Sequence, residues 1–260
     1  MDKSKIKQYG DELYNALITR TAVDPLTDRE AEITIEDAYQ IQQRMIQRRL
    51  DAGETIIGKK IGVTSKVVMD MLKVNQPDFG MMTSGMVFNE GEAIEASSMI
   101  APRAEAEVAF ILKRDLMGPG VTAADVLRAT ECVVPCFEIV DSRIKDWKIK
   151  IQDTVADNAS CGVLTLGGVR RSPRDIDLAL AGMVLEKNGE IISTSTGAAV
   201  QGSPVNAIAW LANTLGRLGI GLKAGEVILS GSQSPLVPVK AGDSLVCSVG
   251  GLGGTSVRFI

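Results

Sequence analysis

The spacing of hydrophobic residues along the chain changes near residue 55. Before this point Ile6, Tyr9 and Leu13 recur at the three- and four-residue spacing of a helix face. Thr34 followed three residues later by Asp37 is typical of a helix start, because each side chain can bond the other residue's backbone N–H group. We therefore predict two helices in this region, the second of which ends before residue 53.

After residue 55, short apolar runs alternate with glycine, which is typical of strands and turns. Asn188-Gly189 predicts a hairpin, since this pair adopts the positive φ angles of a tight turn. Ser203-Pro204 predicts the start of a helix, because proline is favoured at the first helical position. Strands are expected at residues 55–61, 86–88, 104–112, 132–140, 163–166, 183–186, 191–194, 227–229, 245–249 and 256–260.

This order of elements predicts an α+β fold. A helical N-terminal segment, residues 1–54, is expected to pack on a β-rich catalytic body, residues 55–260, as one functional domain. At 260 residues the chain is long enough to bury a core without disulfides or a structural metal.

The charge and the cysteines narrow the class of protein. The net charge of −4, with no basic block, makes nucleic acid an improbable partner. The start of the chain lacks the apolar core of a signal peptide, and no apolar run reaches the length of a membrane span, so we expect a cytoplasmic protein. The four cysteines follow no metal-binding spacing, and we interpret them as buried free thiols.

The chain contains no histidine. This excludes catalytic triads and dyads that use histidine, histidine-bound zinc, and imidazole as a general base. Proton transfer must therefore rely on Asp, Glu, Lys, Tyr, Cys or water bound to a metal. A metal site would be rich in oxygen ligands, which suits Mg²⁺ or Mn²⁺.

Three acids stand in apolar strands. Glu105 and Glu107 lie two residues apart and so share one face of the expected strand 104–112. Glu138 stands alone in the apolar strand 132–140, where an unpaired carboxylate is costly. Together the three could hold a divalent cation with open positions for a substrate. A solvated sheet face is the alternative, because spacing cannot show that the two strands are neighbours.

Other polar residues allow two interpretations. Lys59 and Lys60 form a surface pair, or one points into the body, where a nearby cation could lower its pKa. Residues 77–80, with Asp78, are first of all expected to form a turn. Residues 157–162 are a turn or the edge of a substrate site.

Over essentially its whole length the chain resembles the 2-hydroxypenta-2,4-dienoate hydratases, also called 2-oxopent-4-enoate or vinylpyruvate hydratases, of the fumarylacetoacetate hydrolase superfamily. These enzymes act in the meta-cleavage degradation of aromatic compounds. Five segments carry the resemblance in the same order: IGKKIGVTS (57–65), QPDFG (76–80), PRAEAE (102–107), FEIVDSR (137–143) and DTVADNASCG (153–162).

The resemblance implies a mixed β-roll core, a helical N-terminal region and a homo-oligomer. It implies that Glu105, Glu107 and Glu138 bind Mg²⁺ or Mn²⁺, that Lys60 and Asp78 handle protons, and that Ser160 contacts the substrate. The expected reaction converts 2-hydroxypenta-2,4-dienoate into 4-hydroxy-2-oxopentanoate, by ketonisation followed by conjugate addition of water.

Three alternatives stay open. A 4-oxalocrotonate decarboxylase would share the metal site, although Asp78 favours hydration, which needs an additional acid or base. An acylpyruvate hydrolase is disfavoured, since such hydrolases commonly use a dyad that contains histidine. The chain could also be a non-catalytic partner of a pathway decarboxylase, and a complex with 4-oxalocrotonate decarboxylase is compatible with catalysis as well.

Overall fold

The N-terminal region is helical in the computed structural model, which describes residues 1–66, 69–70 and 73–260. Thr34 and Asp37 form the predicted capping box at the start of the second long helix. A further helix of four residues lies between the two predicted ones. The helices are α1 (Lys3–Thr19), α2 (Leu26–Arg29) and α3 (Ile35–Asp51).

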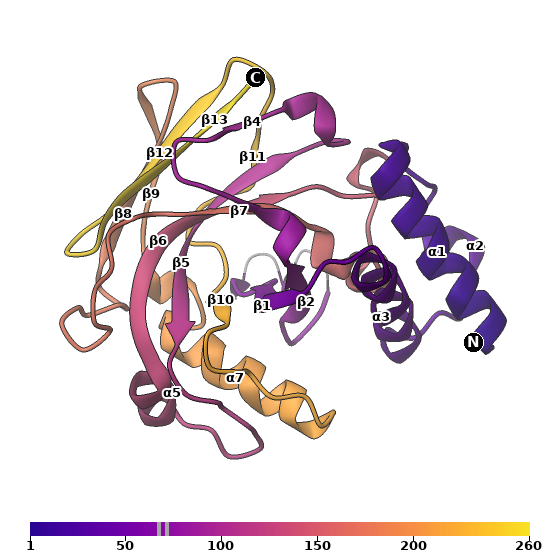
Figure 1. Cartoon of the computed structure of the whole chain (residues 1–260), viewed down its shortest axis with the longest axis horizontal. Coiled ribbons are helices and arrows are strands. Elements are labelled where there is room, and N and C mark those ends of the chain that lie inside the picture. Colours follow the sequence, from indigo (N-terminus) through magenta and orange to yellow (C-terminus); the bar gives the residue numbers. More distant parts are fainter. Residues whose placement is uncertain (67–68, 71–72) are drawn as a thin grey trace.

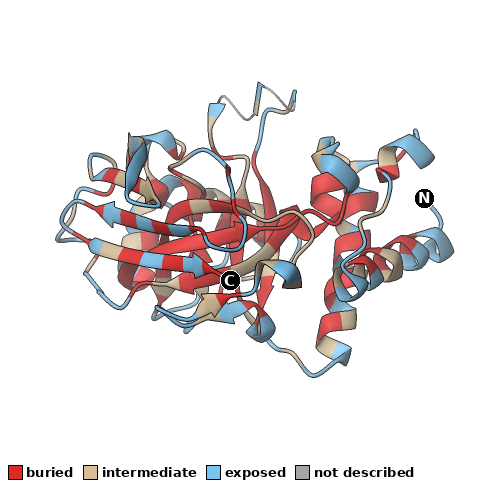
Figure 2. Cartoon of the chain, turned by 90° about the horizontal axis from the view of Figure 1, so that it is seen from above, coloured by how far each residue is buried: buried red, intermediate tan, exposed pale blue. Residues whose placement is uncertain are grey.

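The helices α1 and α3 pack against each other, and Leu13, Ile41 and Met45 are buried between them. A later helix, α6 (Ile151–Ala156), contributes Val155 to the same apolar cluster. This cluster of helices stands beside the β-rich part of the molecule (Figures 1 and 2). α6 thus links the N-terminal helices to the segment that follows it, residues 157–160.

Within the described residues, eight strands form the main sheet, in the order β2-β1-β10-β5-β6-β7-β3, with β11 paired to β5. β5 and β6 are antiparallel neighbours and curve together through the molecule (Figure 1). The strands are β1 (Ile56–Gly62), β2 (Asp78–Thr83), β3 (Val87–Phe88), β5 (Arg103–Leu112), β6 (Thr130–Val140), β7 (Cys161–Leu166), β10 (Val227–Leu229) and β11 (Val237–Pro238).

A second sheet contains the predicted hairpin, whose turn residues Asn188 and Gly189 have the expected positive φ angles. In the described part of the chain its order is β4-β13-β12-β8-β9. The strands are β4 (Ala93–Ile94), β8 (Gly182–Lys187), β9 (Glu190–Thr196), β12 (Ser244–Val249) and β13 (Gly253–Phe259).

The two faces of β5 have different surroundings because side chains alternate along a strand. Ala106, Val108 and Phe110 join a large core that also includes residues of the second sheet and of α7 (Pro204–Arg217). Glu105 and Glu107 lie on the opposite face. The strand is therefore fixed by apolar burial on one side and is free to present acids on the other.

The α+β prediction is confirmed, and one local prediction is wrong. Residues 77–80 were expected to form a turn, but Asp78 begins β2, which pairs with β1. A short helix, α5 (Ala123–Ala129), has Thr122 as its N-cap. Pro204 occupies the first position of α7 as predicted, although the Ser203 side chain makes no capping hydrogen bond.

No helix among the described residues is long and apolar enough to span a membrane. All four cysteines are buried free thiols, as the sequence indicated.

Candidate functional site

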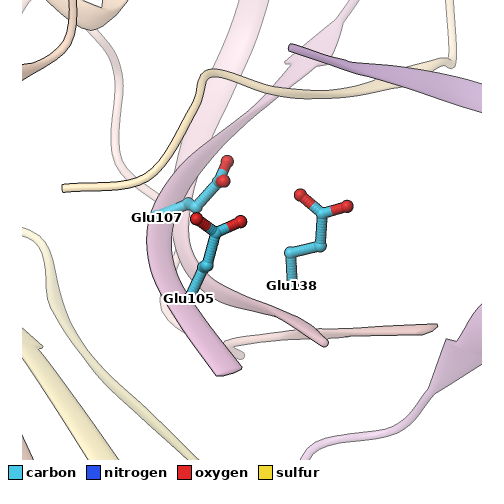
Figure 3. A group of neighbouring side chains, drawn as sticks. All are labelled: Glu105, Glu107 and Glu138. Carbon is cyan, nitrogen blue, oxygen red and sulfur yellow. The ribbon is translucent and has the colours of Figure 1, made fainter. Parts of the chain in front are cut away.

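The register of β5 and β6 brings the three acids together. Glu105 lies directly opposite Glu138, and Glu107 lies two residues further along β5. One carboxylate oxygen from each residue lies within 4.8 Å of the others. Figure 3 shows the three side chains pointing toward a common space, with Glu138 facing the two acids of β5. The convergence that spacing alone could not establish is therefore present.

The acids have fewer partners among the described residues than buried carboxylates normally have. Glu107 and Glu138 are fully buried, and Glu105 is partly exposed. Glu107 accepts a hydrogen bond of 2.9 Å from the backbone N–H of Gly231, but among the described residues its other oxygen has no partner. Such buried, unsatisfied oxygens are costly unless another positive group binds them. A solvated sheet face is thereby excluded.

Burial and mutual repulsion shift Glu105 and Glu107 toward their protonated forms. Burial raises the pKa of Glu105 to about 7, and the Glu138 carboxylate adds to this rise while Lys60 opposes it. Burial and the same neighbouring carboxylate raise the pKa of Glu107 well above its usual range. In its ionised form the cluster would therefore carry more negative charge than the surrounding chain compensates.

Lys60 is the cation nearest to Glu138. It lies on β1 and is 3% exposed, and its Nζ is 3.1 Å from Oε1 of Glu138. This contact is an ion pair without hydrogen-bond geometry, since neither oxygen of Glu138 accepts a hydrogen bond from the described residues. Burial lowers the pKa of Lys60, but Glu138 and Asp78 outweigh it, so the pKa is raised. Without a bound cation the pKa of Lys60 is therefore raised, whereas a nearby cation was expected to lower it.

Lys59 and Lys60 are both buried, so the expectation of a surface lysine pair is wrong. The two side chains alternate across β1, and Lys59 forms an ion pair with Glu226. Lys59 is thereby neutralised, whereas Lys60 is shared by several acids.

Asp78 approaches Lys60 from the neighbouring strand. It lies opposite Gly62 in the register of β1 and β2. A Cβ atom at position 62 would clash with Oδ1 of Asp78 and would lie 3.4 Å from Nζ of Lys60, so this glycine leaves room for both groups. Burial raises the pKa of Asp78 to about 6, although Lys60 opposes the rise. Asp78 can therefore exchange a proton near neutral pH.

Ser160 lies at the end of a short left-handed segment, the 3₁₀ turn η4 (Asn158–Ser160). Asn158, Ala159 and Ser160 have φ angles of 54°, 51° and 53°. Ser160 is 3% exposed, and its hydroxyl has no hydrogen-bond partner among the described residues. Residues 157–161 are thus a buried turn with an unsatisfied hydroxyl rather than a turn in solvent, and a role at the edge of a substrate site stays a prediction.

A cleft of about 520 Å³ adjoins the start of β2. Its apolar wall comes from α3, through Ile35 and Tyr39, and from α6, through Ile151 and Val155, and Asp78 also lines it. The Tyr39 ring stacks on Phe79, with 4.3 Å between ring centroids. A small organic molecule could reach the side of Asp78 through this cleft.

Sequence reasoning missed two supporting groups. The fully buried Arg143 donates hydrogen bonds to the carboxylate of Asp157, the residue that precedes η4. Gly231, with a φ of 104°, passes close to Thr64 and bonds Glu107. In the sequence, Arg143 and Asp157 are marked only as charged residues in two polar segments. Gly231 is marked only as a glycine between two serines.

The cluster fits a divalent metal ion. Its donors are carboxylate oxygens, they converge, and several are buried without a partner among the described residues. Hard cations such as Mg²⁺, Mn²⁺ and Ca²⁺ prefer this set of ligands.

Fold and site together define the class of protein, and the chain belongs to the fumarylacetoacetate hydrolase family. The family model described as "Fumarylacetoacetate (FAA) hydrolase C-terminal" matches residues 59–259. A solved structure of 4-oxalocrotonate decarboxylase from Pseudomonas putida G7, complexed with magnesium and adipate, matches with a TM-score of 0.97 and 34% identity. The match covers 100% of this chain and 99% of that chain.

Curated relatives are similar over most of the chain. A 2-hydroxypent-2,4-dienoate hydratase of Pseudomonas putida is 65% identical over 85% of this chain and 100% of its own length. A 2-hydroxyhexa-2,4-dienoate hydratase of Comamonas testosteroni is 57% identical over 99% of this chain and 98% of its own length. The family resemblance seen in the sequence is confirmed.

Proposed function

We propose that this chain is a metal-dependent hydratase of 2-hydroxypenta-2,4-dienoate or a close homologue with a longer tail. The observation that carries the proposal is the convergence of three acids, two of them fully buried with unsatisfied oxygens, next to Lys60 and Asp78. The names of the 65% and 57% identical relatives supply the substrate class. The product is 4-hydroxy-2-oxopentanoate, formed by the net addition of one water molecule.

Glu105, Glu107 and Glu138 would hold the cation, which we propose to be Mg²⁺ or Mn²⁺. When bound, the cation supplies Lewis acidity that stabilises negative charge on the 2-oxygen of the substrate. The role of the chain is to orient these oxygens: the large core holds β5 from its far side, and the Gly231 N–H group fixes one oxygen of Glu107. The remaining oxygens stay available as ligands.

Lys60 and Asp78 would move the protons. In ketonisation the 2-hydroxyl group loses a proton and C5 gains one, which gives a conjugated 2-oxo-3-enoate. Water then bonds to C4 through its oxygen, and a proton is delivered to C3. Two proton-handling groups on adjacent strands, both buried and facing Glu138, suit this sequence of transfers.

Ser160 would bind the substrate through its hydroxyl group. This group is buried without a partner among the described residues, so a substrate oxygen would satisfy it. The cleft beside Asp78 would admit the substrate, with its apolar wall toward the hydrocarbon end.

A decarboxylase is the second candidate, because the structure with a TM-score of 0.97 is a 4-oxalocrotonate decarboxylase. We favour hydration, since identity to that enzyme is 34% whereas identity to the two hydratases is 65% and 57%. A homo-oligomer, a complex with a decarboxylase and a cytoplasmic location stay predictions.

The test is to incubate the protein with freshly generated 2-hydroxypenta-2,4-dienoate and, separately, with 4-oxalocrotonate, each with Mg²⁺ and with a chelator. We expect NMR to detect 4-hydroxy-2-oxopentanoate from the first substrate only when metal is present. Rapid CO₂ release from 4-oxalocrotonate without hydration of the dienoate would instead identify a decarboxylase. No turnover of either substrate would support the non-catalytic partner.

A further inference from the structure

The strand that carries Asp78 and the turn that carries Ser160 are joined by a single side chain. The Asn158 amide donates a hydrogen bond of 2.8 Å to the carbonyl oxygen of Met81, and its Oδ1 accepts one of 2.8 Å from the Met81 N–H. Met81 is the fourth residue of β2, which begins at Asp78. Asn158 therefore pairs with β2 in the way that another strand would.

We infer that Asn158 is a positioning residue that holds Ser160 and Asp78 in one fixed arrangement across the substrate site. The inference rests on the proposed function, in which Ser160 binds the substrate and Asp78 handles a proton. No side chain among the described residues hydrogen-bonds the Ser160 hydroxyl or the Asp78 carboxylate, so the backbone near each group must hold it in place.

The conformation of η4 supports this role. Three successive residues in the left-handed region are costly for side chains other than glycine, and such strain persists only where surrounding contacts enforce it. Asn158 tolerates this conformation, but Ala159 and Ser160 gain nothing from it. The contacts that enforce it come from both sides: Arg143 binds Asp157 before the turn, and Asn158 binds β2.

The turn and the strand also approach each other closely. A Cβ atom at Gly80 would lie 2.5 Å from the backbone carbonyl oxygen of Asn158. Gln42 of α3 adds a second link, since its amide donates to the carbonyl oxygens of Phe79, at 2.9 Å, and Val155, at 3.0 Å. β2 and the segment α6–η4 thus meet along a continuous line, and Asn158 makes the contact closest to Ser160.

The experiment compares Asn158→Gly and Asn158→Ala with a matched control, Asn213→Ala. Glycine at 158 keeps the left-handed backbone and removes the two hydrogen bonds, whereas alanine removes both features. Asn213 lies on α7, outside the site, and makes the same pair of hydrogen bonds. Its Oδ1 accepts from the N–H of Val121, and its amide donates to the carbonyl oxygen of Val121, each at 2.8 Å. Removing these two bonds in Asn213→Ala should lower the midpoint of thermal unfolding and leave catalysis unchanged.

We expect Asn158→Gly and Asn158→Ala to lower kcat/KM for the dienoate by about tenfold or more, because small misplacements of reacting groups are costly. Their affinity for Mn²⁺, measured by calorimetry, should equal that of the unmodified chain, since the acids lie on β5 and β6. Asn213→Ala should keep full kcat/KM.

The inference is overturned if Asn158→Gly retains the kcat/KM of the unmodified chain, or if Asn213→Ala loses as much as Asn158→Gly at an equal loss of thermal stability. A fall in Mn²⁺ affinity equal to the fall in kcat/KM would also overturn it, because the defect would then lie in the metal site. If the unmodified chain does not hydrate the dienoate, the proposed function itself fails, and that outcome is distinct from all of these.

Discussion

Among the described residues, two of the buried groups of charged side chains are built on opposite principles. In the first, Asp157 accepts hydrogen bonds from the backbone and guanidinium of Arg143, and the same guanidinium bonds the carbonyl oxygens of Asp141, Asp157 and Cys161. In the second, three glutamates and Asp78 surround Lys60, and several carboxylate oxygens have no partner among the described residues.

The first group supports the fold, whereas the second is suited to binding and chemistry. The Arg143–Asp157 pair is internally neutral and saturated with hydrogen bonds, so it can hold a strained turn but offers nothing to a ligand. When ionised, the acid cluster has an excess of negative charge, and several of its oxygens have no partner among the described residues, so a bound cation would stabilise it. The two groups should therefore respond in opposite ways to mutation and to metal.

The largest effect is expected at Glu107. Glu107→Gln keeps the shape of the side chain but removes its charge. Loss of a residue that only hydrogen-bonds a metal ligand costs about 10–100-fold in metal affinity or activity. Loss of a ligand itself should therefore lower kcat/KM by more than about 100-fold. An absorbance assay of dienoate decay checks this. Activity within tenfold of that of the unmodified chain would remove Glu107 from the ligand set.

Asp157 should show the opposite behaviour. Asp157→Ala leaves the fully buried Arg143 without its partner, which should lower the free energy of unfolding by about 3–5 kcal/mol. Denaturant titration of the metal-free protein measures this loss, and Glu107→Gln serves as the control that should not destabilise. A stable Asp157→Ala protein would show that the turn does not depend on the pair.

The acid cluster should contribute to the pH dependence of stability, in the same direction as Asp157, whose pKa burial raises to about 6. The pKa values of Glu105 (about 7), Glu107 (raised) and Asp78 (about 6) lie above their ordinary values, so the folded chain binds more protons than the unfolded chain. Stability of the metal-free protein should then fall as pH rises from the ordinary carboxyl range toward about 7. Thermal unfolding measured across this pH range should show a smaller fall in stability for Glu107→Gln than for the unmodified chain. Addition of Mg²⁺ to the unmodified chain should also reduce the fall. An increase in stability over the same range would contradict the raised pKa values.

The smallest effect concerns the strain in η4. Ala159 has a φ of 51°, and Ala159→Gly should raise the free energy of unfolding by about 1 kcal/mol, because glycine adopts this conformation without the cost of a Cβ atom. The measurement is again denaturant titration, with kcat/KM expected to stay unchanged. A destabilised variant would mean that the Cβ atom of Ala159 contributes more through packing than it costs in strain.

Local patterns predicted the parts of this arrangement that depend on neighbours in sequence. The capping box at Thr34, the Asn188-Gly189 hairpin and the shared face of Glu105 and Glu107 all follow from short-range geometry. The strand pattern also suggested that the three glutamates could hold a cation. The β-roll fold and the roles of Lys60, Asp78 and Ser160 came from resemblance to a family, which residue spacing alone does not supply.

Pairings between distant segments were beyond such patterns. The register that sets Glu105 opposite Glu138 is decided by the whole of β5 and β6. β2 was mistaken for a turn because proline, aspartate and glycine dominate residues 77–80, whereas its pairing with β1 determines the strand. The clamp between Asn158 and Met81 joins residues 77 positions apart and leaves no periodic signal in the sequence.

The most direct test of the metal-dependent hydratase is to measure dienoate hydration by one metal-free preparation as Mn²⁺ is added in known steps, with bound metal counted at each step. Hydratase activity should rise from near zero in proportion to occupied sites and level off at one ion per chain, the number that a single three-acid cluster can hold. Full hydration by protein that retains no bound metal would contradict the account.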